Sequence, residues 1–532
     1  FVAIRFGTET LFSRDQLDIV EIDQSLGDFS SNLYSRLLRS RELRESRSKL
    51  IIDVFPIVFL DAANAAEIDE AEIDSQICSS YEGLADYLTR LRHEPIDPRL
   101  AAEVRSVVEG AKALTRPQKR TVEDPARQPL AVAMARLEAE IANFDEKQRR
   151  VALVEVGGPA RIRGLAGSGK TVILAMKAAH IHLTRPDERI LVTFFTRGLR
   201  STLKNLITKF YRHYSESDPD WDQIHIRHGW GGARTPGVYA DACRRANSSP
   251  LDLRRAQSIA KGGDAFGAAC ADLLATSTPS PYYDYLLIDE GQDFPSSFYE
   301  LCYKITKGEQ DRKNIIWAYD ELQNILDVQI RSPEVLFGRD EQNVPRVLLD
   351  RSARFAPTGA SNDVVLSKCY RNQRSVLVAA HALGFGVYGS IVQLLESAGH
   401  WQDVGYEVLT GELVTGEPVV VNRPAENSPL EIEAGPAFPL IGWAGHNNFD
   451  DEVSWVVEGV ASFIAGGLTP EEILVVSLDD RAARRYFEHI SAGLAARNIA
   501  TNNIIADPFN EPAFSMPNMV TLSTVYRAKG NE

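Results

Sequence analysis

Apolar and polar positions change their period along the chain, and from residue 130 onward they predict strands and helices in alternation. Strands are predicted at short apolar runs rich in Ile, Leu and Val, namely residues 160–163, 189–195, 283–289 and 314–319. An amphipathic helix is predicted at residues 132–144, and another begins at Lys170. This alternation is typical of a parallel, doubly wound sheet with helices on its faces.

A second group of strands is predicted at residues 363–367, 473–477 and 519–523. We therefore predict an α/β fold with two lobes, residues 130–360 and 361–532, and a cleft between them. The first lobe is long enough to hold an accessory subdomain at residues 201–281. The second lobe carries a small β-rich insert at residues 405–433.

The first 114 residues have a different pattern and predict a separate α+β domain. Residues 50–60 read as a buried strand interrupted by Pro56, and residues 82–91 and 100–114 have helical periodicity. Residues 115–129 are basic and contain proline, which indicates a linker.

Length and composition narrow the class of protein. The 532 residues exceed what one hydrophobic core supports, so several structural units are expected. The five cysteines are scattered and form no CxxC pair, which disfavours a disulfide framework or a zinc site and fits a reduced, cytoplasmic setting. No apolar run approaches about 18 residues, so no membrane-spanning helix is predicted. The net charge of −15 disfavours a uniformly basic nucleic-acid coat but is compatible with a local basic groove.

A glycine-rich loop after the first predicted strand carries the clearest chemistry. Residues 164–171 (GLAGSGKT) fit the GxxxxGK[ST] phosphate-binding pattern, and the strand before and the helix after the loop disfavour a chance glycine run. Backbone N–H groups and the helix N-terminus are expected to hold the phosphates of ATP. Lys170 is expected at the β- and γ-phosphates and Thr171 at Mg²⁺. The predicted nucleotide-binding residues of the loop are Gly164, Gly167, Ser168, Gly169, Lys170 and Thr171.

Two acidic residues follow the apolar strand at residues 283–289. Asp289 is expected at the carboxyl end of this strand, where ligands bind in open α/β sheets, and is the predicted partner of Mg²⁺. Glu290 is placed to activate the attacking water. The alternative, that both acids only cap a buried strand, is less favoured beside a phosphate loop.

The remaining motifs resemble those of the UvrD/Rep-like superfamily 1 helicases. Residues 289–293 (DEGQD) resemble the DExQD box of that family, and the rest of the series follows in order from residue 130 to 532. The resemblance implies two RecA-like lobes that hydrolyse ATP with Mg²⁺ in the cleft between them. It also implies a nucleic-acid partner, most readily single-stranded DNA, and movement from 3′ to 5′.

The resemblance assigns further residues to the nucleotide. Gln148 matches the glutamine that reads adenine. Gln323, in residues 319–323 (YDELQ), matches a γ-phosphate sensor. Arg371, in residues 369–372 (CYRN), matches an arginine that projects from the second lobe to the γ-phosphate, and Glu532 matches the residue at the ribose.

The resemblance places three residues at the nucleic acid. Thr196 lies in residues 192–197 (VTFFTR), which resemble a backbone-contacting segment, and Thr524 begins a segment resembling the TxHxxKGxE motif. Trp230 lies where the family has another strand-contacting motif, although packing within the loop core is an equally good interpretation. A basic set in the accessory region is a candidate for phosphate contacts, with a solvated face as the alternative: Lys204, Lys209, Arg212, Arg227, Arg234, Arg244 and Arg245.

The chain departs from the family at several points. Tyr319 and Tyr526 replace the usual glycine and histidine, and residues 324–329 lack the aromatic residue that stacks on a base. Stacking contributes about 1–3 kcal/mol per base, so its loss weakens stepping along a strand. The large insertion of UvrD-like second lobes is missing. The family's last motif, with its second arginine, is also missing, because the sequence stops at Glu532 within a motif, so we expect a longer natural protein.

These observations leave two functional hypotheses. The first is an ATP-driven helicase or translocase, with bacterial DNA repair or phage defence as its setting. The second is a switch, in which ATP binding recruits or licenses a partner such as a nuclease without processive unwinding. In residues 1–114, Asp53, Glu21 and Asp23 lie near predicted strands, but no ExK or DxK follows on the next strand, so a scaffold or partner-binding role is favoured over a divergent nuclease.

Overall fold

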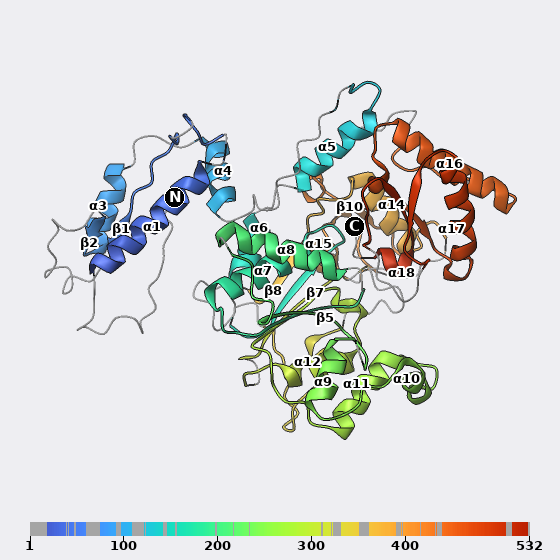
Figure 1. Cartoon of the computed structure of the whole chain (residues 1–532), viewed down its shortest axis with the longest axis horizontal. Coiled ribbons are helices and arrows are strands. Elements are labelled where there is room, and N and C mark those ends of the chain that lie inside the picture. Colours follow the sequence, from blue (N-terminus) through green and yellow to red (C-terminus); the bar gives the residue numbers. More distant parts are fainter. Residues whose placement is uncertain are drawn as a thin grey trace. The chain divides into compact units, whose positions relative to one another are not determined.

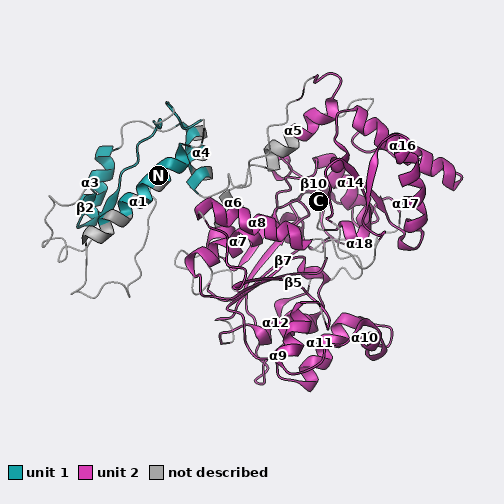
Figure 2. Cartoon of the chain, in the orientation of Figure 1, with its two compact units in different colours: residues 1–112 teal, residues 113–532 magenta. Residues whose placement is uncertain are grey.

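In a computed structural model of the protein, the chain forms two compact units, residues 1–112 and 113–532 (Figure 2). The break falls two residues before the predicted boundary at residue 114, and both predicted lobes lie in the second unit. The structure describes residues 19–38, 40, 42–46, 49–59, 75–91, 97–108, 122, 124–141, 146–154, 157–196, 199–215, 217–233, 235–309, 312–320, 322, 331–349, 361–389, 395, 397–414, 416–430, 432, 439–506 and 513–529.

The first unit combines helices with a short two-stranded sheet. Strands β1 (Ile57–Phe59) and β2 (Gln76–Cys78) pair in parallel. The strand predicted at residues 50–60 is therefore confined to the three residues after Pro56, since proline cannot donate to a strand ladder. The helices are α1 (Ile19–Leu37), α3 (Tyr81–Leu91) and α4 (Pro98–Val108). A small core joins α1 and α4 through Leu37, Leu43, Leu50, Val104 and Val107.

The carboxylates singled out in this unit do not form a described cluster. Asp53 is exposed, and one oxygen of Asp23 accepts a hydrogen bond from the Ser75 main-chain N–H at 3.0 Å. The side chain of Glu21 lies outside the described residues. The contact of Asp23 is therefore structural, since it joins α1 to the segment that enters β2.

A six-stranded parallel sheet forms the centre of the second unit, with the order β5-β4-β6-β7-β3-β8. Its strands are β3 (Ala160–Gly164), β4 (Ile190–Phe194), β5 (Ile224–His228), β6 (Tyr285–Ile288), β7 (Asn314–Tyr319) and β8 (Asp363–Leu366). The central strands β4 and β6 are buried along their whole length, which explains their continuous apolar sequence.

Helices cover both faces of this sheet (Figure 1). On one face lie α6 (Glu146–Leu153), α7 (Lys170–Thr184) and α8 (Leu199–Tyr214). On the other lie α9 (Val238–Arg245), α11 (Ala265–Thr276) and α12 (Ser296–Ile305), with α10 (Leu253–Ala260) and α13 (Pro333–Phe337) beside them. The core of this second face is aromatic and includes Tyr283, Phe298, Trp317 and Phe337. The α/β class and the parallel sheet predicted from the sequence are confirmed.

Strand β8 corrects one prediction. The sequence places residues 363–367 in the second lobe, but β8 pairs in parallel with β3 at the edge of the six-stranded sheet. The carboxylate of Asp363 binds the guanidinium groups of Arg161 at 2.6 Å and Arg163 at 3.1 Å. Arg161 and Arg163 alternate with apolar residues along β3, so both point to the same side of the strand, where they contact Asp363.

A second, smaller sheet contains β11 (Leu474–Ser477), β13 (Met519–Thr524) and β12 (Ala500–Asn503), all parallel in that order. Helices α16 (Phe449–Ala465) and α17 (Asp480–Ala495) pack on one face through Val457, Phe487, Ile490 and Leu522. The short helix α18 (Val525–Ala528) follows β13.

Between the two sheets in sequence lie α14 (Arg374–Gly384), α15 (Ala398–Asp403) and the antiparallel pair β9 (Glu407–Thr410) and β10 (Val420–Asn422). This pair occupies the insert predicted at residues 405–433. Helix α5 (Pro129–Ile141) precedes the first sheet. Within the described chain, no helix combines the length and the apolar character needed to cross a membrane.

Candidate functional site

The glycine-rich loop joins β3 to α7 at the carboxyl edge of the six-stranded sheet. Gly167 and Gly169 have φ angles of 77° and 86°, in the left-handed region that favours glycine. Gly164 is required for a different reason, because a Cβ there would lie 2.5 Å from the Ser168 hydroxyl oxygen. The local sequence therefore fixes a tight curl directly before a helix of 15 residues.

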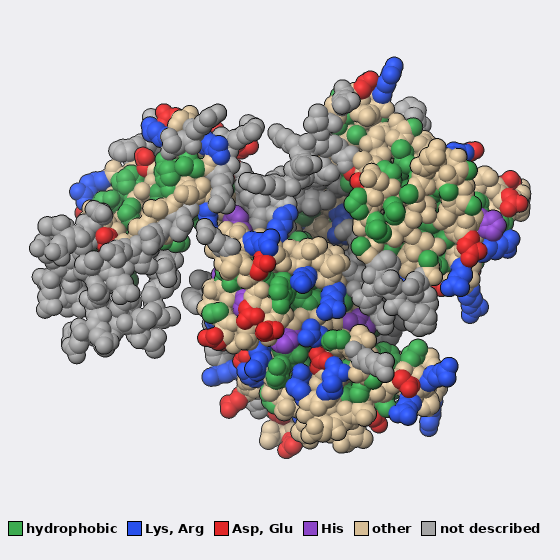
Figure 3. All heavy atoms as spheres, viewed as in Figure 1, with side chains coloured by type: hydrophobic (Ala, Val, Ile, Leu, Met, Phe, Trp, Pro, Cys, Tyr) green, Lys and Arg blue, Asp and Glu red, His purple; other side chains and the backbone are tan. Residues whose placement is uncertain are grey.

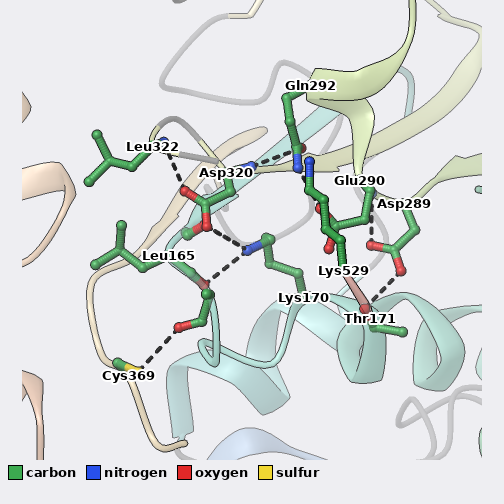
Figure 4. A network of polar contacts seen from close by, with 12 residues as sticks. Leu165, Lys170, Thr171, Asp289, Glu290, Gln292, Asp320, Leu322, Cys369 and Lys529 are labelled. Carbon is green, nitrogen blue, oxygen red and sulfur yellow. Dashed lines mark hydrogen bonds and ion pairs between the residues drawn. The ribbon is translucent and has the colours of Figure 1, made fainter. Parts of the chain in front are cut away.

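Lys170 places its amine inside this curl (Figure 4). The Nζ atom donates to the carbonyl oxygens of Gly164 at 2.7 Å and Leu165 at 2.9 Å, and it lies 3.7 Å from a carboxylate oxygen of Asp320. Lys170 and Asp320 are both buried. Burial raises the pKa of Asp320, and the Lys170 charge opposes that rise. The curl thus holds a buried cation whose main-chain bonds an anion can replace.

Thr171 and Asp289 meet at the end of β6. The threonine hydroxyl donates to a carboxylate oxygen of Asp289 at 2.8 Å, and the main-chain N–H of Glu290 donates to the other oxygen at 3.0 Å. Burial, and then the neighbouring charge of Glu290, raise the pKa of Asp289 to about 7. The two residues predicted to bind Mg²⁺ therefore lie together and present only oxygen atoms.

Gln292 organises the acidic residues around the site. Its side-chain nitrogen donates to the Glu290 carboxylate, and its side-chain oxygen accepts from the main-chain N–H of Asp320 at 3.1 Å. These bonds connect the end of β6 with the end of β7. Gln292 and Asp320 lie within the motifs at residues 289–293 and 319–323, but the sequence alone predicts no role for either side chain.

A second ion pair joins the two sheets. The Lys529 amine, after α18, binds both carboxylate oxygens of Asp293, at 2.7 and 2.8 Å. Burial raises the pKa of Asp293, and the Lys529 charge opposes that rise. The sequence reading gives neither residue a role, because residues 236 positions apart carry no local signal of contact.

The segment carrying Arg371 lies on the phosphate loop. The Cys369 thiol donates to the Ala166 carbonyl at 3.2 Å, and the Tyr370 main-chain N–H donates to the Gly167 carbonyl at 3.1 Å. A Cβ on Gly167 would lie 2.7 Å from the Arg371 Cβ. The structure therefore brings Arg371 to the loop, but on a segment that follows β8 of the first sheet rather than a second-lobe strand.

Gln148 also lies beside the loop. Its side chain is buried on α6, and its amide nitrogen donates to the Ser168 carbonyl at 2.6 Å. Ser168 is fully buried. Gln323 and Glu532, the two other predicted nucleotide-binding residues, lie outside the described residues.

The residues predicted to contact nucleic acid fall in two places. Thr196 follows β4 and Trp230 follows β5. The nearby rings of Phe195 and His228 have centroids 6.3 Å apart. Trp230 stacks on Phe266 with centroids 5.1 Å apart. Thr524 is buried at the end of β13, in the other sheet.

The basic side chains of the accessory region are largely engaged within the protein. Arg212 pairs with Asp218, and Arg227 and Arg244 share Asp241. Lys204 lies 5.1 Å from the Trp221 ring centroid, and Arg245 lies over Tyr282, while Arg234 is outside the described residues. Basic and acidic side chains are interspersed on the face seen in Figure 3. Of the basic side chains in this set, Arg212, Arg227 and Arg244 are thus paired with acidic residues, whereas a dedicated phosphate track would present them as a stripe of one sign.

No known protein family model matches this chain, and no curated protein matches it significantly.

Proposed function

We propose that this protein is an ATPase of the superfamily 1 helicase type, built on two RecA-like lobes, that uses ATP hydrolysis to move on single-stranded DNA. The observation that carries the proposal is the contact between Thr171 and Asp289 beneath the glycine-rich loop, with Glu290 next to it. A hydroxyl and two carboxylates beside a buried lysine form a donor set suited to a magnesium–nucleotide complex.

The residues present fit ATP and Mg²⁺. The loop from Gly164 to Thr171 and the N-terminus of α7 would hold the phosphates, and Thr171 and Asp289 would hold the metal. Mg²⁺ supplies charge neutralisation on the phosphates. Gln148, whose amide donates to Ser168 of the loop, would contact the base.

The protein's own groups divide the chemistry between them. Lys170 would exchange its two carbonyl partners in the loop for phosphate oxygens. Its charge would interact strongly with the phosphates there, because the site is buried. Glu290 would accept the proton of the attacking water, and the amide of Gln292 holds that carboxylate in place. Arg371 would add positive charge from the segment on the loop, and Gln323 and Glu532 keep their proposed roles at the γ-phosphate and ribose.

The nucleic-acid side of the proposal rests on sheet topology. Thr196 and Trp230 follow adjacent parallel strands, so they lie at the same sheet edge as the phosphate loop. Thr524 would contact the strand from the smaller sheet. This arrangement supports a nucleic-acid track that communicates with the ATP site.

ATP turnover measured with and without single-stranded DNA tests the proposal. We expect stimulation by DNA in the wild-type protein and no turnover in a Lys170→Ala variant. Equal rates with and without DNA would overturn the nucleic-acid part of the proposal. Absence of turnover in the wild-type protein under both conditions would overturn the ATPase itself.

A switch without processive unwinding is the second candidate, and Trp230 favours it. Its ring is stacked on Phe266 and its Nε1 lies 3.5 Å from the Leu251 carbonyl oxygen, so it is engaged within the protein. Residues 324–329 supply no aromatic replacement. In this case residues 1–112 would recruit the partner. A strand-displacement assay separates the candidates: ATP-dependent unwinding supports the motor, and DNA-stimulated turnover without displacement supports the switch.

A further inference from the structure

A buried arginine lies at the base of the β9–β10 insert, outside every motif considered above. Arg423 follows β10 and is 1% exposed. Its guanidinium nitrogens donate to one hydroxyl and three carbonyl oxygens: Ser428 Oγ at 2.7 Å, Val404 O at 2.7 Å, Ser367 O at 3.0 Å and Asn427 O at 2.7 Å. The side chain thus ties together three separate stretches of the chain.

The electrostatic setting of Arg423 is unusual. No Asp or Glu pairs with it among the residues that the structure describes, and burial lowers the pKa of its guanidinium. The ring of Tyr406 lies 5.3 Å away and offers a further contact to the cation. Burying a charge without a counter-ion opposes folding, so this arrangement is a poor source of stability. What the guanidinium provides is a fixed geometry among its acceptors.

That geometry is transmitted to the segment that carries Arg371. The Asn427 carbonyl, which accepts from Arg423, also accepts from the Cys369 main-chain N–H at 2.9 Å. Ser367, the acceptor at the end of β8, lies two residues before Cys369. Arg423 therefore bonds directly to Ser367 and shares the Asn427 acceptor with Cys369, which lies two residues before Arg371.

We propose that Arg423 is a positioning residue for ATP hydrolysis, which holds the segment from Ser367 to Arg371 against the phosphate loop. The inference rests on the proposed ATPase function and on a role for Arg371 in it. The three guanidinium nitrogens of Arg423 all donate to protein oxygen atoms. An arginine is required because its planar fork reaches acceptors on different sides, whereas a lysine presents one compact ammonium group.

The first test is Arg423→Lys, with Ser428→Ala as a milder variant that removes only the hydroxyl acceptor. We expect kcat for ATP to fall by about a hundredfold in Arg423→Lys, the scale of a small misplacement of a reacting group. The affinity for a fluorescent ATP analogue should stay within about twofold, because the phosphate loop is intact. Ser428→Ala should also lower kcat, but by a smaller factor than Arg423→Lys. Arg497→Lys, at an exposed ion pair with Glu458, is the matched control and should behave as the wild type.

A double-mutant cycle with Arg371→Ala separates positioning from general damage. If Arg423 acts through Arg371, Arg423→Lys should lower kcat little or not at all when Arg371 is already absent. An equal loss of kcat in both backgrounds would overturn the proposal, as would wild-type kcat in Arg423→Lys. If Arg423→Lys does not fold, the same cycle run with Ser428→Ala decides in the same way. A wild-type protein without ATP turnover would overturn the proposed function instead, so the two failures are distinguishable.

Discussion

Replacing Asp289 with Asn removes a buried charge while keeping the shape of the side chain. In the wild-type protein, burial and Glu290 raise the pKa of Asp289 to about 7, from an ordinary value of 3.8. Between these two values the folded protein holds a proton that the unfolded chain releases. The stability associated with Asp289 is therefore present at pH 4 and is lost as the pH rises toward 7.

The magnitude follows from the width of that window. One proton of difference changes the free energy of unfolding by about 1.4 kcal/mol per pH unit. Over the roughly three units of the window, the wild-type protein should lose about 4 kcal/mol relative to Asp289→Asn, whose amide does not titrate. Groups that do not interact with Asp289 titrate equally in both proteins and cancel in the comparison.

Urea unfolding of both proteins, followed by tryptophan fluorescence from pH 4 to 7.5 without nucleotide or metal, measures this difference. We expect the free energy of unfolding of the Asn variant to rise steadily relative to that of the wild type as the pH increases. Parallel stability profiles would refute the reasoning, because they would mean that Asp289 is already ionised in the folded protein at pH 4. A Glu334→Gln variant, at an exposed ion pair with Arg339, serves as the control and should follow the wild-type profile.

Other contacts lead to three shorter predictions. Lys170→Ala should reduce ATP turnover, measured by phosphate release, below about 1% of wild type, because the loop loses its buried cation; more activity contradicts its assigned role. Gly167→Ala places a methyl group 2.7 Å from Arg371 at a φ of 77°, so kcat should fall, whereas Gly262→Ala, at a φ of 92° with open space around it, should retain wild-type kcat. Trp230→Ala should lower stability by about 3 kcal/mol in chemical denaturation, as expected for loss of a packed aromatic ring; an unchanged unfolding midpoint would mean that the stacked ring adds nothing to the fold.

The parts of the fold that the sequence predicts best are those with continuous apolar character. Strands β4 and β6 are buried throughout and stand out as runs of Ile, Leu and Val. Strand β5, with the sequence IHIRH, and strand β12, with the sequence ATNN, were missed. Both are edge strands, where only one neighbour is needed and polar residues are tolerated, so neither forms a continuous apolar run.

The candidate site shows the same division between local and distant information. The curl of residues 164–171 is encoded locally, because glycine is required at the left-handed positions. The contact of Lys529 with Asp293 and the bonds of Arg423 depend on how distant segments pack, which composition and spacing do not reveal. The sheet membership of β8 is another such case, since it depends on the pairing with β3 and on the contacts of Asp363 with Arg161 and Arg163.

The pairing of β8 with β3 bears on how the proposed cycle would transmit movement. The segment that carries Arg371 follows β8 and is bonded to Gly167, so Arg371 would move with the phosphate loop. A change in the separation of the two sheets would leave that arginine in register with the loop. The side chain that would sense such a change is Lys529, whose bond to Asp293 runs from one sheet to the other. Arg371 would then supply catalytic charge, while Lys529 would respond to the separation of the sheets, so either role could be altered without the other.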